Sequence, residues 1–161
     1  MPGLCENRTV IVTGAGGGLG KGYAKALGAA GANVVVNDIN AETAAATVAE
    51  ITGENGSANV DTSDITDHEA AGRLVQATIM AYGDIHGVVN NAGGQFPSPL
   101  ANINQKGWET VVRTNLTGGF LIAREAYNQV LSKTGGAIVN IVADMWGGMP
   151  GMGGMGGMGG M

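Results

Sequence analysis

Glycine is concentrated where a short apolar segment near the start of the chain gives way to a helical pattern. The segment RTVIVT at residues 8–13 precedes it, and residues 19–30 follow with apolar positions at helical spacing. Glycines let a backbone turn tightly and approach a diphosphate closely, and the start of a helix offers free N–H groups and a favourable dipole. We therefore predict dinucleotide binding here, the alternative being a plain glycine-rich turn. The candidate residues are Thr13, Gly14, Gly16, Gly17, Gly18, Leu19 and Gly20.

A carboxylate follows the second apolar segment. Asp38 comes directly after Asn33–Asn37, at the spacing where an acidic residue accepts hydrogen bonds from the adenosine ribose. The same charge would repel the additional phosphate of NADP, and neither Gly17 nor Ile39 supplies an arginine to hold that phosphate. We therefore expect NAD to be bound in preference to NADP, with Asp38 and Ile39 beside the ribose. The alternative is that Asp38 is a turn or cap residue before the next helix.

Alternating strands and helices must position these residues. β-Branched and apolar segments predict strands, and apolar residues at helical spacing predict helices. On the helix predicted at 67–82, the apolar side is formed by Leu74, Val75, Ile79 and Met80. The predicted strands are 8–13, 33–37, 57–61, 85–90 and 137–142, and the predicted helices are 19–30, 41–52, 67–82 and 104–132.

This alternation predicts an α/β fold with a doubly wound parallel sheet. Strands joined by helices form right-handed parallel units, and apolar strands indicate a sheet covered on both faces, which gives three αβα layers. The expected sheet order is 3-2-1-4-5, with the ligand at the carboxyl ends of strands 1 and 4. The length of 161 residues fits one domain, which we place at residues 1–146.

Charge and composition argue against several classes of partner. The formal net charge is −5, the isoelectric point is about 4.8, and the basic residues are scattered singly. This pattern argues against nucleic acid and against acidic membranes, both of which need concentrated positive charge. The single cysteine, Cys5, cannot form an internal disulfide, and no zinc-ligand spacing is present. With no signal-peptide pattern and no long apolar run, we expect a cytoplasmic protein that acts on a small-molecule substrate.

Three ordered motifs resemble the short-chain dehydrogenase/reductase family. They are Gly14-xxx-Gly18-x-Gly20, then Asn90-Asn91-Ala92-Gly93, then Asn115, and the resemblance covers about residues 7–146. It implies a Rossmann-like fold and an oxidoreductase that transfers hydride between nicotinamide and a carbonyl, alcohol or enoyl substrate. Residues 90–153 most resemble the dienoyl-CoA and enoyl-CoA reductase-like branch, near members that resemble citronellol or citronellal dehydrogenases. The segment VVVNDIN resembles NAD-using hydroxyacyl dehydrogenases, in agreement with Asp38.

The resemblance also implies roles for residues outside the glycine segment. Asp64 would contact the adenine amine and Ile65 the adenine ring, while Asn90, Ala92 and Gly93 would line the cofactor. Asn115 would be the asparagine of the catalytic tetrad and would hold a water of the proton relay. From its own surroundings, Asn115 has an alternative role as a polar residue that satisfies backbone groups in a helix kink beside Gly118 and Gly119.

The chain departs from the family at the catalytic residues. The serine position of the resemblance falls at Ala143, which has no hydroxyl, and none of Tyr23, Tyr82 and Tyr127 begins a Tyr-xxx-Lys motif. We therefore expect a C-terminally truncated family member with an incomplete sheet. Two hypotheses remain open: an oxidoreductase of the family type, and an NAD-binding fragment without catalysis.

Two further expectations concern the last helix and the C-terminal segment. If the sheet is incomplete, apolar residues of the helix at 104–132, such as Phe120 and Leu121, stay exposed and form a contact for a homo-oligomer. Residues 147–161 repeat glycine and methionine, which predicts a flexible tail. The alternative for the tail is Cu(I) binding by the thioethers of Met149, Met152, Met155, Met158 and Met161.

Overall fold

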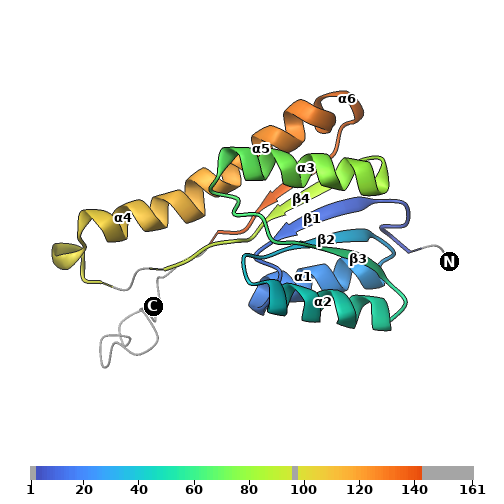
Figure 1. The fold of residues 1–161 in the computed structure, drawn as a ribbon, viewed down its shortest axis with the longest axis horizontal. Coiled ribbons are helices and arrows are strands. Elements are labelled where there is room, and N and C mark those ends of the chain that lie inside the picture. The colour runs from blue at the N-terminus through green and yellow to red at the C-terminus, as the bar shows by residue number, and fades with distance from the viewer. Residues whose placement is uncertain (1–2, 96–97, 143–161) are drawn as a thin grey trace, which may run out of the picture.

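A five-stranded parallel sheet forms the centre of the computed structural model, which describes residues 3–95 and 98–142 (Figure 1). The strand order β3-β2-β1-β4-β5 confirms the predicted order 3-2-1-4-5. The C-terminal segment 147–161, with its predicted flexibility and its methionines, lies outside the described residues. The strands are β1 (Thr9–Thr13), β2 (Asn33–Asn37), β3 (Ser57–Asp61), β4 (Gly87–Asn90) and β5 (Ala137–Asn140).

Helices cover both faces of the sheet, as the doubly wound pattern predicts (Figure 1). On one face lie α1 (Gly18–Ala29) and α2 (Ala41–Gly53). On the other face lie α3 (His68–Tyr82) and the helical region that begins with α4 (Gln105–Val112). Within the described residues, no helix is both long enough and apolar enough to cross a membrane.

Two apolar cores separate according to the alternation of side chains along the strands. Val10 and Val12 of β1 pack with Ala24 of α1 and Ile51 of α2. Ile11, on the opposite side of the same strand, belongs to the core that the helices of the other face complete. Because β1 is buried on both faces, its central residues are apolar without interruption.

The parallel register brings polar residues together at the carboxyl ends of the strands. Thr13 is paired with Asn37, and Asn37 with Asp61, so that the last residues of β1, β2 and β3 are neighbours. Asn90 at the end of β4 is paired with Asn140 of β5. This edge of the sheet therefore presents hydrogen-bonding groups from all five strands, beside the start of α1.

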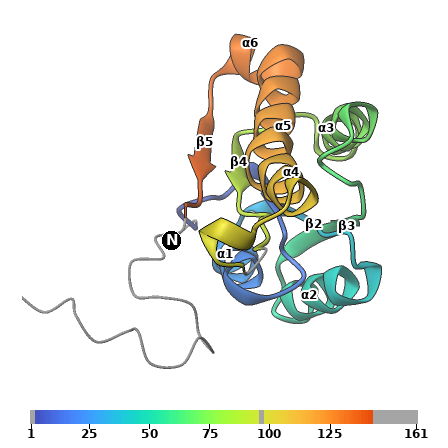
Figure 2. The same cartoon turned by 90° about the vertical axis from the view of Figure 1, so that its left-hand side faces the viewer.

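The helix predicted at 104–132 is one continuous helical column with two wider turns (Figure 2). Its segments are α4, the π-helical segment η2 (Arg113–Gly118), α5 (Gly119–Ala126), the π-helical segment η3 (Tyr127–Leu131) and α6 (Ser132–Thr134). A short 3₁₀ helix, η1 (Leu100–Asn102), precedes the column. Short π-helical turns occur frequently at functional sites, and η2 contains Asn115.

Two of the predicted apolar positions are placed differently in the structure. Met80 is 81% exposed, because it lies two residues, or about 200°, around α3 from the buried Thr78. Leu121 was expected to stay exposed, yet it is only 8% exposed and lies in the core beside Ile122. Its neighbour Phe120 is 57% exposed, as expected, because successive helical residues point in different directions.

Candidate functional site

The start of α1 differs from the starts of α2, α3 and α4. α2, α3 and α4 are capped by the side chains of Asn40, Asp67 and Asn104, each of which accepts a backbone N–H. The N-cap of α1 is Gly17, which offers no side-chain acceptor, and the first turn of α1 contains no acidic residue. The N–H groups of this turn are therefore left for another acceptor, and the helix dipole favours an anion there. This arrangement fits a diphosphate.

The glycines of this segment serve two different purposes. Gly14 has φ +63°, and a Cβ built on it would lie 2.8 Å from Cα of Ala92, so the turn packs tightly against the loop after β4. A Cβ on Gly16 would collide with Thr43 and Asp38. Cβ atoms on Gly17 and Gly18, in contrast, would meet nothing within 4 Å. The first two glycines permit close packing within the protein, and the next two leave the outer side of the turn open to a ligand.

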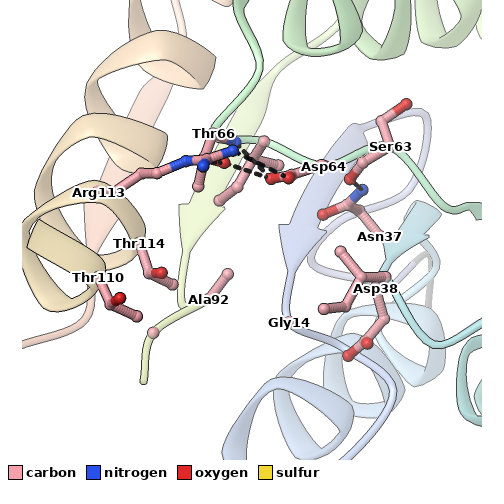
Figure 3. Close-up of a pocket in the computed structure, with 13 residues that line it drawn as sticks. Gly14, Asn37, Asp38, Ser63, Asp64, Thr66, Ala92, Thr110, Arg113 and Thr114 are labelled. Atoms are coloured by element: carbon pink, nitrogen blue, oxygen red, sulfur yellow. Dashed lines mark hydrogen bonds and ion pairs between the residues drawn. The ribbon is translucent and has the colours of Figure 1, made fainter. Parts of the chain in front are cut away.

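Backbone hydrogen bonds hold the carboxylate of Asp38 in place. Oδ2 accepts the N–H of Gly16 at 2.9 Å, and Oδ1 accepts the N–H of Asn40 at 2.9 Å. The second bond shows that the turn role considered for Asp38 is real, but it does not remove the side chain from the cleft. Asp38 and the exposed Ile39 line a cavity of ≈ 460 Å³, together with Gly14 (Figure 3). A carboxylate on this wall can accept further hydrogen bonds from a ribose.

The loops after β3 and β4 also line this first cavity. Asp64, Ile65, Ala92 and Gly93, all predicted to contact the cofactor, line it (Figure 3). Ile65 is buried and also belongs to the core, so only part of its side chain is available to a ligand. No motif in the sequence indicated the residues that α4 and η2 contribute to the cavity. They are Thr110, Arg113 and Thr114.

Asp64 is held by hydrogen bonds from Thr66. Its Oδ1 accepts the backbone N–H of Thr66 at 2.8 Å and the hydroxyl at 2.7 Å, and Arg113 Nη2 lies 3.6 Å from Oδ2. The Thr66 hydroxyl lowers the pKa of Asp64 most, and the Thr66 N–H and the Arg113 charge lower it further against the opposing effect of partial burial. The carboxylate is therefore ionised, and it can accept hydrogen bonds within the cavity.

A second cavity, of ≈ 830 Å³, lies beside the first and shares Ala92 and Gly93 with it. Four other predicted residues line this second cavity: Thr13, Leu19, Asn90 and Asn115. Apolar side chains from the helical column, Leu116 and Phe120 among them, also line it. The two cavities thus follow the carboxyl ends of β1 and β4 on either side of the shared Ala92 and Gly93, which suits an elongated ligand with two different ends.

Hydrogen bonds between Thr13 and Asn91 connect the glycine turn to the loop after β4. The buried Thr13 hydroxyl accepts the N–H groups of Asn91 at 3.1 Å and Ala92 at 3.0 Å. In return, Nδ2 of Asn91 donates to the carbonyls of Thr13 at 3.0 Å and Gly14 at 3.2 Å. Asn91 had been identified only as part of the Asn90-Asn91-Ala92-Gly93 motif, and its position beside Asn90 was the available signal. Its contacts hold together the two loops that form the site.

Asn115 binds the backbone of a single residue. Its Oδ1 accepts the N–H of Gly94 at 2.7 Å, and its Nδ2 donates to the carbonyl of Gly94 at 3.0 Å. The alternative role, in which this amide satisfies backbone groups, describes these contacts, although the groups belong to the loop after β4 and not to the helix kink itself. The role of Asn115 in holding a catalytic water stays a prediction.

Asn90 is buried between β4, β5 and α5. Its Nδ2 donates to the carbonyl of Gly119 at 3.1 Å and to Oδ1 of Asn140 at 2.9 Å. Within the described part of the chain, its own Oδ1 is buried without a hydrogen-bond partner. Since most of its side chain is engaged with the protein, Asn90 supports the wall of the second cavity more than it faces a ligand.

Of the catalytic residues that the resemblance implies, Asn115 lines the second cavity. Among the described residues that line the two cavities there is no tyrosine and no lysine. Ala143, at the expected serine position, lies outside the described residues. Tyr82 is partly buried on α3, where burial raises the pKa of its hydroxyl, and Tyr127 is exposed on η3. The described residues therefore line two cavities that contain no tyrosine or lysine as a proton donor of the expected type.

Comparison with known proteins gives consistent matches along the chain. A family model described as short chain dehydrogenase matches residues 8–155. The dehydrogenase subunit BbsD of Thauera aromatica is 34% identical over 146 residues, which cover 91% of this chain and 59% of the relative. The chain thus spans about three fifths of the length of this curated relative.

Solved structures show the same similarity. The citronellol catabolism dehydrogenase AtuB of Pseudomonas aeruginosa PAO1 is 54% identical with a TM-score of 0.86, and the match covers 95% of this chain and 63% of that chain. A 7α-hydroxysteroid dehydrogenase in complex with NADH and 7-oxo glycochenodeoxycholic acid is 32% identical with a TM-score of 0.82, covering 88% and 55%. The similarity thus extends across the sheet, both cavities and the helical column.

Proposed function

Because this chain belongs to the short-chain dehydrogenase family, we propose that its residues form the NAD-binding part of an oxidoreductase. Bound NAD would accept hydride from an alcohol substrate, and bound NADH would donate hydride to a carbonyl or enoyl substrate. The observation that carries the proposal is the start of α1, which lacks a side-chain cap while Gly16 beside it holds Asp38 at the first cavity. The starts of α2, α3 and α4 have side-chain caps, and the uncapped start of α1 supports placing the diphosphate there.

The two cavities suit the two ends of NAD. In the first cavity, Asp38 would accept hydrogen bonds from the ribose hydroxyls, and Asp64 would accept a hydrogen bond from the adenine amine. In the second, the loop of Ala92, Gly93 and Gly94 would line the nicotinamide end, with Asn115 fixing this loop. We propose NAD over NADP because the additional phosphate would lie against the Asp38 carboxylate, while the nearby cation, Arg113, is already paired with Asp64.

Substrate would enter the second cavity beside the nicotinamide. Leu116 and Phe120 give this cavity an apolar wall, which favours a substrate with an apolar body. The similarity to the citronellol catabolism dehydrogenase makes citronellol and related alcohols the first substrates to test. Enoyl thioesters are the next substrates to test, because residues 90–153 resemble the dienoyl-CoA and enoyl-CoA reductase-like branch.

A second candidate is NAD binding without turnover. It is favoured by the described lining of both cavities, which contains no tyrosine and no lysine. Reduction of a carbonyl needs a proton donor near its oxygen, and Ala143 has no hydroxyl to provide one.

Calorimetric titration with NAD, NADP and ADP-ribose tests the binding proposal. We expect NAD to bind more tightly than NADP, and we expect Gly18→Val, which adds a side chain at a residue with φ +52° at the start of α1, to weaken both. Failure of both NAD and ADP-ribose to bind would overturn the proposal. Turnover of NAD with citronellol, or of NADH with enoyl thioesters, above the level of Gly18→Val supports the oxidoreductase. Binding without such turnover supports the second candidate.

A further inference from the structure

We propose that Arg113 is a positioning residue for adenine recognition, and that it acts through Asp64 and Thr66. The inference rests on the proposed binding of NAD. It concerns a residue that has no assigned role in the binding motifs described above. It explains how one wall of the first cavity comes to present an ionised, oriented acceptor to the base.

Arg113, Thr66 and Asp64 form a closed set of contacts (Figure 3). Nε of Arg113 donates to Oγ1 of Thr66 at 2.9 Å, and the Thr66 hydroxyl donates to Oδ1 of Asp64 at 2.7 Å. Nη2 of Arg113 completes the set at 3.6 Å from Oδ2 of Asp64. Arg113 is the first residue of η2, and Thr66 is 47 positions earlier in the sequence, so the contacts tie the helical column to the loop after β3.

The two oxygens of Asp64 are in different situations. Oδ1 accepts both donors of Thr66, whereas the 3.6 Å separation between Oδ2 and Arg113 is an ion pair longer than a hydrogen bond. Oδ2 therefore keeps its capacity to accept a hydrogen bond in the cavity that both residues line. Thr66 and Arg113 together orient this oxygen and favour its charge.

An ionised acceptor at this place discriminates between purines. The 6-amino group of adenine donates a hydrogen bond, whereas the 6-oxo group of hypoxanthine is an acceptor that a carboxylate opposes. Removal of Arg113 would release Oδ2 from its orientation and leave the preference for the amino purine weaker. The side chain of Arg113 is 63% exposed, so it contributes little to the core.

Arg73 provides a matched control. It forms an ion pair with Glu69 at the same separation, 3.6 Å, its side chain is 65% exposed, and it lies on α3 away from the lining of both cavities. Surface ion pairs of this kind contribute little to stability, so neither arginine variant should unfold the protein. A change specific to Arg113 then reports on the adenine end of the site.

The test measures dissociation constants of NAD and of nicotinamide hypoxanthine dinucleotide for the full chain and for R113M, R113K and R73M. We expect R113M to weaken NAD binding about fivefold and to reduce the ratio between the two dinucleotides, with R113K intermediate and R73M unchanged. Unfolding temperatures should stay the same for all variants. If the ratio of the two dissociation constants for R113M equals that of the unchanged chain, whether or not both constants rise, the inference is wrong. If the unchanged chain binds neither NAD nor ADP-ribose, the proposed function itself fails.

Discussion

Gly16 donates its backbone N–H to Oδ2 of Asp38 at 2.9 Å and thereby ties the glycine turn to the end of β2. A side chain at position 16 would collide with the same carboxylate, so the hydrogen bond depends on glycine. Under the proposed function, the group that would accept the ribose and the turn that would hold the diphosphate are consequently positioned as one unit. A change in either should affect both.

The first prediction concerns the charge of Asp38. We expect Asp38→Asn to weaken NAD binding about tenfold, because hydrogen bonds to a charged acceptor are stronger than those to a neutral one. The affinity for NADP should fall less, since the repulsion of its additional phosphate is also removed. Calorimetry with both cofactors measures the two changes. Glu42→Gln, which removes an equal charge from the start of α2, should leave the ratio unaltered; an altered ratio in this control would point to net charge instead.

The second prediction concerns the buried hydroxyl of Thr13. We expect Thr13→Val to reduce the free energy of unfolding by about 2 kcal/mol, because the N–H groups of Asn91 and Ala92 would lose their acceptor while the volume stays the same. Thr13→Ser keeps the hydroxyl and should lose less. Urea unfolding of both variants measures the difference. Equal losses in the two would show that packing of the methyl group, and not hydrogen bonding, stabilises this junction.

The third prediction compares two glycines of α1. A Cβ at Gly20 would overlap the carbonyl of Gly14 and lie 2.5 Å from Nδ2 of Asn91, whereas one at Gly22 would meet nothing within 4 Å. We expect Gly20→Ala to destabilise the fold by about 1–3 kcal/mol through overpacking. Gly22→Ala should stabilise it by up to about 1 kcal/mol through helix propensity. Thermal unfolding without ligand tests the pair, and a tolerated Gly20→Ala would contradict the close approach described here.

The fourth prediction concerns acid stability. Burial alone would raise the pKa of Glu125, but hydrogen bonds from Arg124, Gln129 and His68 outweigh it, and the pKa lies below the ordinary 4.5. A carboxylate whose pKa is lowered by folding stabilises the fold fully at a pH above its pKa in the unfolded chain. It loses this contribution as the pH falls through its pKa in the folded chain. Glu125 therefore contributes fully above pH 4.5, and its contribution decreases below it.

We expect Glu125→Gln to be less stable than the unchanged chain near neutral pH, with the difference shrinking as the pH falls below 4.5. Urea unfolding across this range measures the effect. Glu69→Gln, at an exposed carboxylate on α3, serves as the control and should show little change at either end of the range. A difference for Glu125→Gln that stays constant with pH would exclude the ionic explanation.

The fifth prediction concerns association of the chain with itself. Leu116, Phe120 and Tyr127 are exposed at positions that share one side of the helical column. Leu116 and Phe120 also line the second cavity, whereas Tyr127 lines neither cavity. We propose that the surface at Tyr127 is a contact between copies of the chain, and we expect Tyr127→Ser to sediment with less dependence on concentration than the unchanged chain. Met80→Ser, at an exposed residue of α3, is the control. Sedimentation of the unchanged chain as a monomer at all concentrations would contradict the proposal.

The sheet and its order could be predicted from the sequence because each strand carries its own signal. β1 and β2 are short, apolar and β-branched, and a helical pattern separates them. The directions of single helical side chains are harder to predict from the sequence. Met80 and Leu121 were misplaced because one position along a helix turns a side chain by about 100°, and apolar character alone does not show which neighbour faces the core.

The contacts that complete the site depend on residues far apart in the sequence. Asn91 binds the carbonyl of Gly14, 77 positions earlier, and Arg113 binds Thr66, 47 positions earlier. Neither pair has a local signal, so a motif can indicate that Asn91 matters without showing what it binds. The π-helical turn at Arg113–Gly118 is equally non-local, since it brings Gly118 against Ile65.

The missing side-chain cap of α1 has a consequence for how much of the protein is folded at a given time. Under the proposed function, a nucleotide that supplies the absent acceptors would bind only the native chain and would shift the folding equilibrium toward the native state. At a hundredfold excess over the dissociation constant this linkage is worth about 2.7 kcal/mol. Under the proposed function, the folded fraction of the chain would therefore rise with the concentration of the dinucleotide.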